Sequence, residues 1–215
     1  MPSGRHFSWL DTLLIEADHA LKTVQHAHHP AKRPSPAKRQ SEQQMDDTQI
    51  AVSKGCMRVN HTGEICAQAL YRGQAITAKK PALRQHLLAA AAEETDHLNW
   101  CQDRLTELNT HTSYLNPFWY IASFKLGILS GLLGDKWSLG FVVATENQVT
   151  THLESHLNRL PPQDLKSRAI LEQMKIDENE HATAALSAGG RTLPKLVQCL
   201  MKCQSKVTTS LAFYI

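Results

Sequence analysis

Glu94-Thr95-Asp96-His97 and Glu178-Asn179-Glu180-His181 are two copies of one pattern, Glu-x-x-His. A lone glutamate precedes each copy, Glu64 in the first case and Glu146 in the second. The gaps between lone and paired glutamates are 30 and 32 residues, which accommodates one helix, a turn and part of the next helix. Four carboxylates and two imidazoles repeated in this way are typical of a di-iron or di-manganese site in a four-helix bundle. The sequence therefore predicts a metal-dependent oxidoreductase.

Each glutamate of the pattern falls among apolar residues at helical spacing. Glu94 belongs to a series that runs from Leu87 to Leu108 in steps of three and four residues, so it occupies a core position of its helix. His97 lies beside it, one turn further on. The same test places the other three glutamates on inward-facing positions: Glu64, Glu146 and Glu178.

Four carboxylates that converge in a core repel one another unless cations hold them together, because burial penalises an unpaired charge. Arg58 or Arg84 is available to neutralise one glutamate, but nothing comparable serves all four. Two divalent ions balance the set, and mixed oxygen and nitrogen ligation favours iron or manganese over zinc. The predicted metal ligands are Glu64, Glu94, His97, Glu146, Glu178 and His181.

Nearby polar residues give weaker signals. His152 follows Glu146 on the same helix, and it either orients a ligand carboxylate or is an ordinary core or surface histidine; His156 leaves the same choice open. Tyr71 lies two turns after Glu64 and either approaches the metals or simply packs. The N-terminal histidines are expected to be solvated: His26, His28 and His29. Six acidic residues are also expected to be exposed: Glu93, Asp96, Glu107, Glu154, Glu172 and Glu180.

Turn signals divide the chain into helices. They are Lys80-Pro81, residues 109–117, Pro161-Pro162 and Gly189-Gly190. Helices are predicted at residues 7–27, 48–79, 82–108, 138–159, 164–188 and 193–213. The predicted fold class is all-α: a ferritin-like four-helix bundle with a di-iron centre, an amphipathic central segment and extra N- and C-terminal helices. Residues 1–45 form an amphipathic helix with a flexible basic linker, and residues 46–215 form the bundle domain.

The central segment, residues 118–145, is apolar but interrupted by Lys125, Asp135 and Lys136. Its uncharged pieces are about half of the roughly 20 residues that a membrane-spanning helix needs. Two interpretations remain: a core crossover between the bundle halves, or a helix in the membrane interface. The aromatic anchors of such an interfacial helix would be Phe118, Trp119, Tyr120, Phe124 and Trp137.

Composition sets further limits. The formal charge of +3 on 215 residues gives no reason to expect nucleic-acid binding. The basic run at residues 31–39 is either a solvated linker or a contact for anionic lipid headgroups. Five cysteines show neither a disulfide framework nor zinc spacing, which favours a reducing interior, and Cys199 and Cys203 are expected to pack inside. Acidic residues near the N-terminus make a mitochondrial transit peptide improbable, so the cytoplasmic face of a bacterial membrane is expected.

Four segments together resemble a known family. Met57-Arg58-Val59-Asn60-His61-Thr62-Gly63-Glu64 is similar to the opening motif of the demethoxyubiquinone hydroxylases, di-iron enzymes of ubiquinone biosynthesis. Glu93-Glu94-Thr95-Asp96-His97, Ala144-Thr145-Glu146 and Asp177-Glu178-Asn179-Glu180-His181 resemble the remaining motifs in order. The resemblance covers residues 48–215, and residues 1–45 look like the extension of bacterial members.

The resemblance implies Glu64, Glu94 and His97 around one iron ion, Glu146, Glu178 and His181 around the other, and Glu94 and Glu178 as bridges. It implies a bundle bound peripherally to the membrane and a polyprenylated benzoquinol substrate. The reaction would be a monooxygenation, in which one atom of dioxygen enters an unsubstituted ring carbon and the other leaves as water. Other ubiquinone-biosynthesis proteins are expected partners.

Several alternatives stay open. The electrons come either from a nicotinamide such as NADH, bound without a Rossmann fingerprint, or from the quinol itself. A ferritin-like iron-handling protein or a peroxidase-type relative would use the same ligands, and a helical scaffold at the membrane would need no metal. The sequence leaves the isoprenoid chain length, the oligomeric state and the role of residues 1–45 undetermined.

Overall fold

A computed structural model describes residues 8–25, 32–41 and 43–215. Within these residues every regular element is helical, which confirms the predicted all-α class. The elements are α1 (Trp9–Val24), the short 3₁₀ helix η1 (Pro36–Arg39), α2 (Asp47–Thr77), α3 (Pro81–Glu107), α4 (Asn116–Leu132), α5 (Asp135–Arg159), α6 (Leu165–Ser187) and α7 (Lys195–Tyr214).

The helix ends lie close to the predicted ones, and local chemistry explains them. Asp46 and Gln49 form a capping box that starts α2, and the Asp164 side chain accepts from Ser167 N–H at the start of α6. Gly134 and Gly189 have positive φ values of 105° and 99°, so the chain turns there at little steric cost. The predicted N-terminal helix is α1, and His26, His28 and His29 lie outside the described residues.

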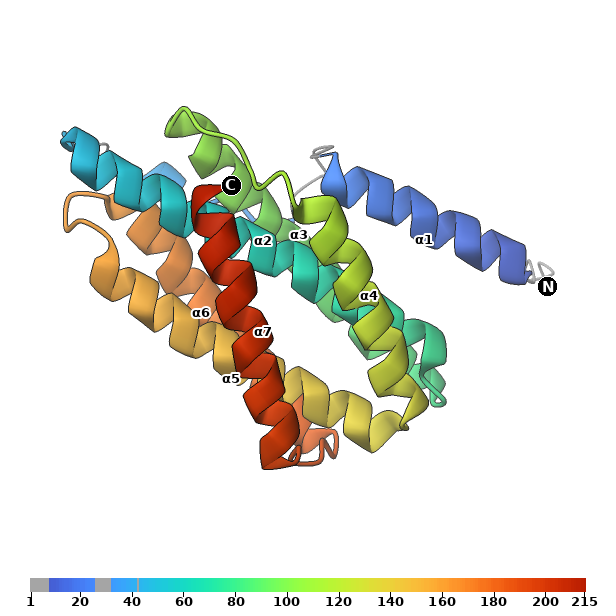
Figure 1. Cartoon of the computed structure of the whole chain (residues 1–215). Coiled ribbons are helices and arrows are strands. Elements are labelled where there is room, and N and C mark those ends of the chain that lie inside the picture. The colour runs from blue at the N-terminus through green and yellow to red at the C-terminus, as the bar shows by residue number, and fades with distance from the viewer. Residues whose placement is uncertain (1–7, 26–31, 42) are drawn as a thin grey trace.

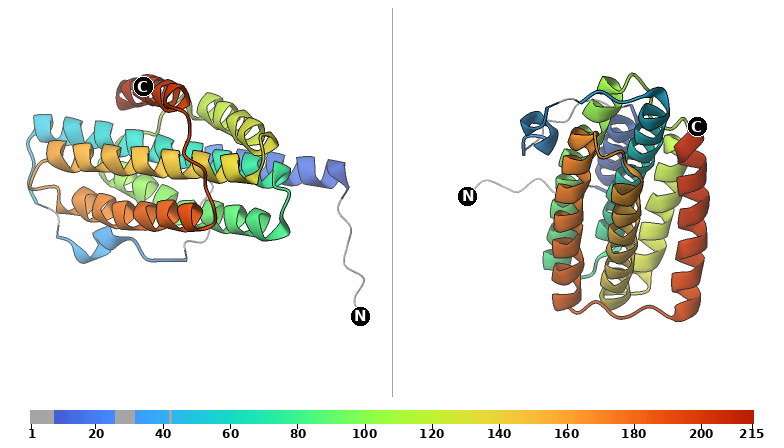
Figure 2. Two further views of the ribbon diagram at one scale, coloured as in Figure 1. Left: turned by 90° about the horizontal axis from the view of Figure 1, so that it is seen from below. Right: turned by 90° about the vertical axis from the view of Figure 1, so that its left-hand side faces the viewer.

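The helices form three layers (Figures 1 and 2). The four bundle helices are α2 and α5 in the middle layer and α3 and α6 on one side of it. On the other side, α4 packs mainly on α2, while α7 crosses α2 and α5. The two crossing helices therefore cover one face of the bundle, and residues 32–41 lie on the opposite α3–α6 face.

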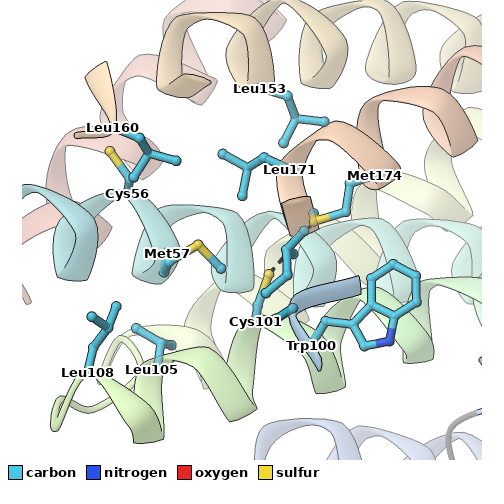
Figure 3. Close-up of a cluster of buried hydrophobic side chains, with 12 residues drawn as sticks. Cys56, Met57, Trp100, Cys101, Leu105, Leu108, Leu153, Leu160, Leu171 and Met174 are labelled. Carbon is cyan, nitrogen blue, oxygen red and sulfur yellow. Dashed lines mark hydrogen bonds between the residues drawn. The ribbon is translucent and has the colours of Figure 1, made fainter. Parts of the chain in front are cut away.

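Two apolar clusters fill the bundle, one on each side of the predicted metal ligands. The first includes Met57, Leu105, Leu153 and Met174, which interdigitate from all four bundle helices (Figure 3). The second includes Leu70, Leu87, Val142 and Ala185, again one residue from each bundle helix. Along every bundle helix the glutamate comes between these two clusters in sequence. Apolar packing on both sides thus fixes the level along the bundle axis at which the carboxylates meet.

The central segment is two helices rather than one, because Gly134 separates α4 from α5. Trp119 and Tyr120 are buried, so the prediction that they are membrane anchors is wrong for this pair. Phe118 on the same helix is 60% exposed. Helix α4 is therefore a crossover with one buried and one apolar exposed face, which combines features of both interpretations. None of the helices in the described residues has the length and apolar character to cross a bilayer.

The N-terminal segment is attached to the bundle. Arg72 on α2 makes a bidentate ion pair with Glu16 on α1, with distances of 2.7 and 2.9 Å. Residues 32–41 run along α3 and α6, and Arg33 forms ion pairs there, so the solvated-linker interpretation is wrong at this residue. The domain boundary between residues 45 and 46 stays a prediction. The interior packing predicted for Cys199 and Cys203 is wrong, since both are exposed.

Candidate metal centre

The six predicted ligands converge at the middle of the bundle. Helix α2 provides Glu64, α3 Glu94 and His97, α5 Glu146, and α6 Glu178 and His181. They form two overlapping groups in which one ligand atom from each residue lies within 4.8 Å of the others. The first group is Glu64, Glu94, His97 and Glu178, and the second is Glu94, Glu146, Glu178 and His181.

Glu94 and Glu178 belong to both groups and use one oxygen for each. Glu94 Oε2 lies 3.1 Å from His97 Nδ1, while its Oε1 lies 3.3 Å from His181 Nδ1. Glu178 is arranged in the opposite sense, with Oε1 at 3.3 Å from His97 Nδ1 and Oε2 at 3.2 Å from His181 Nδ1. Both histidines therefore turn Nδ1 towards the carboxylates, and the two Glu-x-x-His segments are related by approximate two-fold symmetry.

The outer nitrogen of each histidine contacts an acidic residue on the opposite segment. His97 Nε2 lies 2.9 Å from Asp177 Oδ2, and His181 Nε2 lies 2.8 Å from Glu93 Oε2. Asp177 directly precedes Glu178, and Glu93 directly precedes Glu94. A carboxylate that accepts from Nε2–H fixes the tautomer in which Nδ1 is free to bind a cation. The sequence motifs gave no sign of this role, and the prediction that Asp96 is exposed is wrong, because this residue is 2% exposed.

Burial and mutual repulsion make ionisation of the outer glutamates difficult. Desolvation, reinforced by the neighbouring glutamates, raises the pKa of Glu64 and of Glu146 well above their usual value. Burial alone would lower the pKa of His181, but hydrogen bonds to Glu178, Glu94 and Glu93 raise it to about 12. The pocket therefore favours positive charge at its centre, whether carried by protons or by metal ions.

The donor set fits divalent cations. Glu64 Oε2 and Glu146 Oε1 are buried, and no hydrogen-bond partner among the described residues reaches them. The arginines that the sequence offered as neutralising groups are elsewhere: Arg58 donates to the carbonyl oxygens of His111 and Phe213, and Arg84 is exposed. The only ion-pair contact to Glu64 Oε2 among the described residues is His97 Nδ1 at 3.5 Å. Carboxylate oxygens that burial has removed from water in this way are ready to bind a metal.

The secondary candidates lie further out. His156 Nδ1 is 3.1 Å from Asn60 Oδ1, and its ring stacks edge to face on His152. His152 Nε2 and Tyr71 Oη are buried and accept or donate no hydrogen bond within the described part of the chain. No hydrogen bond or ion pair among the described residues joins these three side chains to the glutamates, so a role in orienting ligands stays a prediction.

A pocket of about 130 Å³ lies beneath α4 and α7 and extends to Glu64. Its lining comes from α2, α4, α5 and α7 and is mostly apolar, with Leu70, Leu126, Phe141 and Met201 among its residues. Glu64 belongs to the same lining. A predominantly apolar molecule therefore has a path to one edge of the carboxylate cluster.

A bundle with a buried, symmetric set of glutamates and histidines defines the class: a ferritin-like helical protein with a carboxylate–histidine centre. Residues 51–212 match the family described as Ubiquinone biosynthesis protein COQ7. The chain belongs to this family, and the predicted resemblance is confirmed.

Curated relatives cover the whole chain. A protein of Nitrosococcus oceani is 52% identical over 212 residues, which is 99% of both chains, and one of Pseudomonas putida strain GB-1 is 51% identical over the full length of both. A relative from Polynucleobacter asymbioticus is 52% identical over 97% of this chain and all of its own. All three carry the name 3-demethoxyubiquinol 3-hydroxylase.

Proposed function

We propose that this chain is a di-iron monooxygenase that hydroxylates a polyprenylated demethoxybenzoquinol in ubiquinone biosynthesis. The observation that carries the proposal is the convergence of two histidines and four buried glutamates, one of which, Glu64, also lines a mostly apolar pocket. Full-length relatives at about half identity are named as hydroxylases of such a quinol, which supports the same reaction class. The chain is thus a hydroxylating oxidoreductase by family and by site.

Two iron ions held by these six residues would supply the activation of dioxygen. Glu64 and His97 would bind one ion and Glu146 and His181 the other, with Glu94 and Glu178 shared between them. The protein itself holds the carboxylates at one height between two apolar clusters and keeps bulk water away from them. Asp177 and Glu93 hold the outer nitrogens of the histidines and keep Nδ1 directed inwards.

The pocket suits a benzoquinol ring with an apolar tail. Its wall is mostly apolar, and its polar lining residues include Glu64, Asn60 and His152. Burial, together with the charge of Arg159, lowers the pKa of His152 to about 4, so this imidazole is neutral and able to accept or donate a hydrogen bond. We infer that a ring hydroxyl lies beside Glu64 and His152 and that the isoprenoid tail extends between α4 and α7.

A substrate with such a tail stays in the bilayer, which leads us to propose peripheral binding to the cytoplasmic side of a bacterial inner membrane. The face covered by α4 and α7 supports this proposal, since it exposes many large apolar side chains: Phe118, Ile121, Leu129, Leu132, Leu133, Leu196, Leu200 and Val207. Helix α1, beside α4, adds Trp9, Leu13 and Leu14 (Figure 1). Other ubiquinone-biosynthesis proteins are proposed partners at the same membrane.

Hydroxylation consumes dioxygen, two electrons and two protons, and releases one water molecule for each hydroxyl group formed. NADH and the quinol are the two proposed electron sources. The quinol substrate must be present in every assay, so adding or withholding NADH from iron-loaded protein under oxygen distinguishes them, because more than one turnover without NADH requires the quinol to supply the electrons.

Glu178→Ala tests the function directly. It removes a carboxylate shared by both halves of the centre, so we expect iron content to fall below two ions per chain and quinol hydroxylation to be lost. The matched control is Glu180→Ala, which removes an exposed carboxylate two residues away and is expected to keep both. Elemental analysis gives the iron content, and mass spectrometry after reaction under ¹⁸O₂ gives the hydroxylation. Two irons and full turnover in Glu178→Ala would refute the assignment.

The alternative is a ferritin-like iron-handling or peroxidase-type protein with the same ligands. The apolar pocket that ends at Glu64 favours the hydroxylase, because neither iron storage nor peroxide reduction needs a path for an apolar molecule. The ¹⁸O₂ experiment separates the two: iron oxidation without labelled product would support the alternative.

A further inference from the structure

Residues 32–41, here called the N-terminal strap, touch the surroundings of only one of the two histidines. The Lys32 backbone N–H donates to Asp96 Oδ1 at 2.7 Å. The Arg33 side chain reaches Asp96 Oδ2 with Nε at 3.3 Å and Asp177 Oδ2 with Nη2 at 2.8 Å. Because Asp177 Oδ2 is also the atom that faces His97 Nε2, one oxygen is shared by the arginine and the histidine. Arg33 Nη2 also lies 3.3 Å from His97 Nε2 itself.

Several contacts hold the strap in this position. Trp100 Nε1–H donates to the Arg33 carbonyl oxygen at 3.3 Å, and the Arg33 guanidinium lies over the Trp100 ring with its central carbon 5.0 Å from the ring centroid. Ala37 in η1 is buried within the apolar cluster that contains Met174. A guanidinium held by two carboxylates and an aromatic face, on a backbone that is itself hydrogen-bonded, has little freedom to move.

The two halves of the centre are therefore supported unequally. Asp177 is 11% exposed and, besides His97, it accepts from Arg33 and from Gln173 Nε2 at 2.9 Å. Glu93, its counterpart beside His181, is 52% exposed, and His181 is its only hydrogen-bond or ion-pair partner among the described residues. His97 is fully buried, whereas His181 is 12% exposed. The approximate two-fold symmetry of the ligands does not extend to the groups behind them.

We propose that Arg33 is a positioning residue of the metal centre. It fixes Asp177, Asp177 fixes His97, and the His97 half of the centre consequently releases its ion more slowly than the His181 half. This inference rests on the proposed di-iron function and adds a role for the N-terminal extension. Groups that hydrogen-bond a ligand histidine typically change metal affinity by about 10- to 100-fold when they are removed.

The test follows iron leaving the intact chain. Protein loaded anaerobically with iron(II) is mixed with excess ferrozine, and the coloured complex is recorded with time. We expect two phases of equal amplitude in the wild-type chain, one per ion. Arg33→Gln should accelerate the slow phase about tenfold and leave the fast phase unchanged. Glu93→Gln should accelerate the fast phase and leave the slow phase unchanged. Lys38→Gln, the same charge change at an exposed strap residue, should alter neither phase.

A double-mutant cycle separates positioning from a general loosening of the bundle. If Arg33 acts through Asp177, then Arg33→Gln has no further effect on the slow phase once Asp177→Asn is present. Mössbauer spectra of the iron(II) protein should show one of two quadrupole doublets shifted by Arg33→Gln, and Arg33→Lys should restore part of the original spectrum. Circular dichroism establishes that each variant is folded, and Arg33→Lys serves in place of any variant that is not.

Different failures have different meanings. Single-phase release from a wild-type chain that holds two irons would overturn the inference and leave the proposed function intact. Equal acceleration of both phases by Arg33→Gln, or an undiminished effect in the Asp177→Asn background, would also overturn it. A wild-type chain that retains no iron would refute the proposed function, and this inference with it.

Discussion

At the scale of single residues, His152 and His156 form a pair of contacting imidazoles, of which His152 lines the pocket. Their ring centroids are 4.0 Å apart, and the rings meet edge to face. Desolvation, with the charge of Arg159, lowers the pKa of His152 to about 4; desolvation, with the charges of His152 and Arg159, lowers that of His156 to about 3. Both imidazoles are therefore neutral in the folded chain at neutral pH, and protonating them opposes folding.

This pair predicts a pH-dependent loss of stability. Because the folded-state pKa values lie below the unfolded value of about 6.5, the stabilisation is fully present above that value and is lost as the pH falls towards the folded pKa values. Between about pH 7 and about pH 5, His156 should contribute a loss of about 2 kcal/mol in the free energy of unfolding. His156→Gln, which keeps an amide to donate to Asn60, should flatten that slope. Urea unfolding of both proteins at equal metal content measures it, and identical slopes would contradict the assignment.

The metal ligands could be predicted from the sequence, whereas the acidic residues that contact the histidines could not, because their positions depend on how the helices pack. Glu94 and His97 could be placed from the sequence because the apolar series around them defines the core face of a helix. Glu93 and Asp177 belong to the same motifs, but their contacts with the histidines depend on which neighbouring helix faces them. Asp96 looked like a surface residue because nothing in the pattern indicated that residues 32–41 would cover it. Sequence periodicity alone does not show which distant segments contact one another.

At the scale of elements, the contact between α2 and α4 depends on glycines. A Cβ added to Gly73 would lie 2.3 Å from the carbonyl oxygen of Phe124, and one added to Gly127 would lie 2.2 Å from that of Leu70. Both neighbours are backbone atoms, which cannot rotate away. The absence of side chains at these two positions lets the helices approach closely and seals one wall of the pocket.

We therefore expect Gly127→Ala to destabilise the chain by about 1 to 3 kcal/mol, because α4 must move off α2. Gly63→Ala is the matched control within a helix: a Cβ there has no neighbour within 4 Å. Its replacement should leave stability unchanged or raise it by about 0.5 to 1 kcal/mol, since alanine favours helix. Urea unfolding gives both values. A Gly127→Ala chain as stable as Gly63→Ala would show that the close contact is not needed.

Helix α4 also shows what sequence can and cannot resolve within one element. The pattern correctly identified an apolar helical segment too short to cross a bilayer. It did not reveal which aromatic side chains point inwards, because residues 118–120 are aromatic on successive positions and carry no periodicity. The packing of α4 on α2 buries Trp119 and Tyr120 and leaves Phe118 outside.

At the scale of the whole molecule, the three layers separate two tasks. The α3–α6 face carries the N-terminal strap and the residues behind His97 (Figure 2). The opposite face, with α4 and α7, carries the pocket and the exposed apolar side chains. An apolar substrate can therefore enter from one side while the metal ligands are held from the other.

This division makes membrane binding testable one face at a time. Leu132 on α4 is 64% exposed, and a glutamate there should weaken binding to phosphatidylethanolamine–phosphatidylglycerol vesicles by about tenfold or more, because a buried leucine contributes about 2 kcal/mol and the new charge resists insertion. Ile176 on α6, 54% exposed in the opposite layer, is the matched control, and Ile176→Glu should bind as wild type. Vesicle flotation measures both, and iron content should be unchanged in each. Should Ile176→Glu lose binding while Leu132→Glu retains it, the membrane face would lie on α6, and entry of the substrate between α4 and α7 would have to be abandoned.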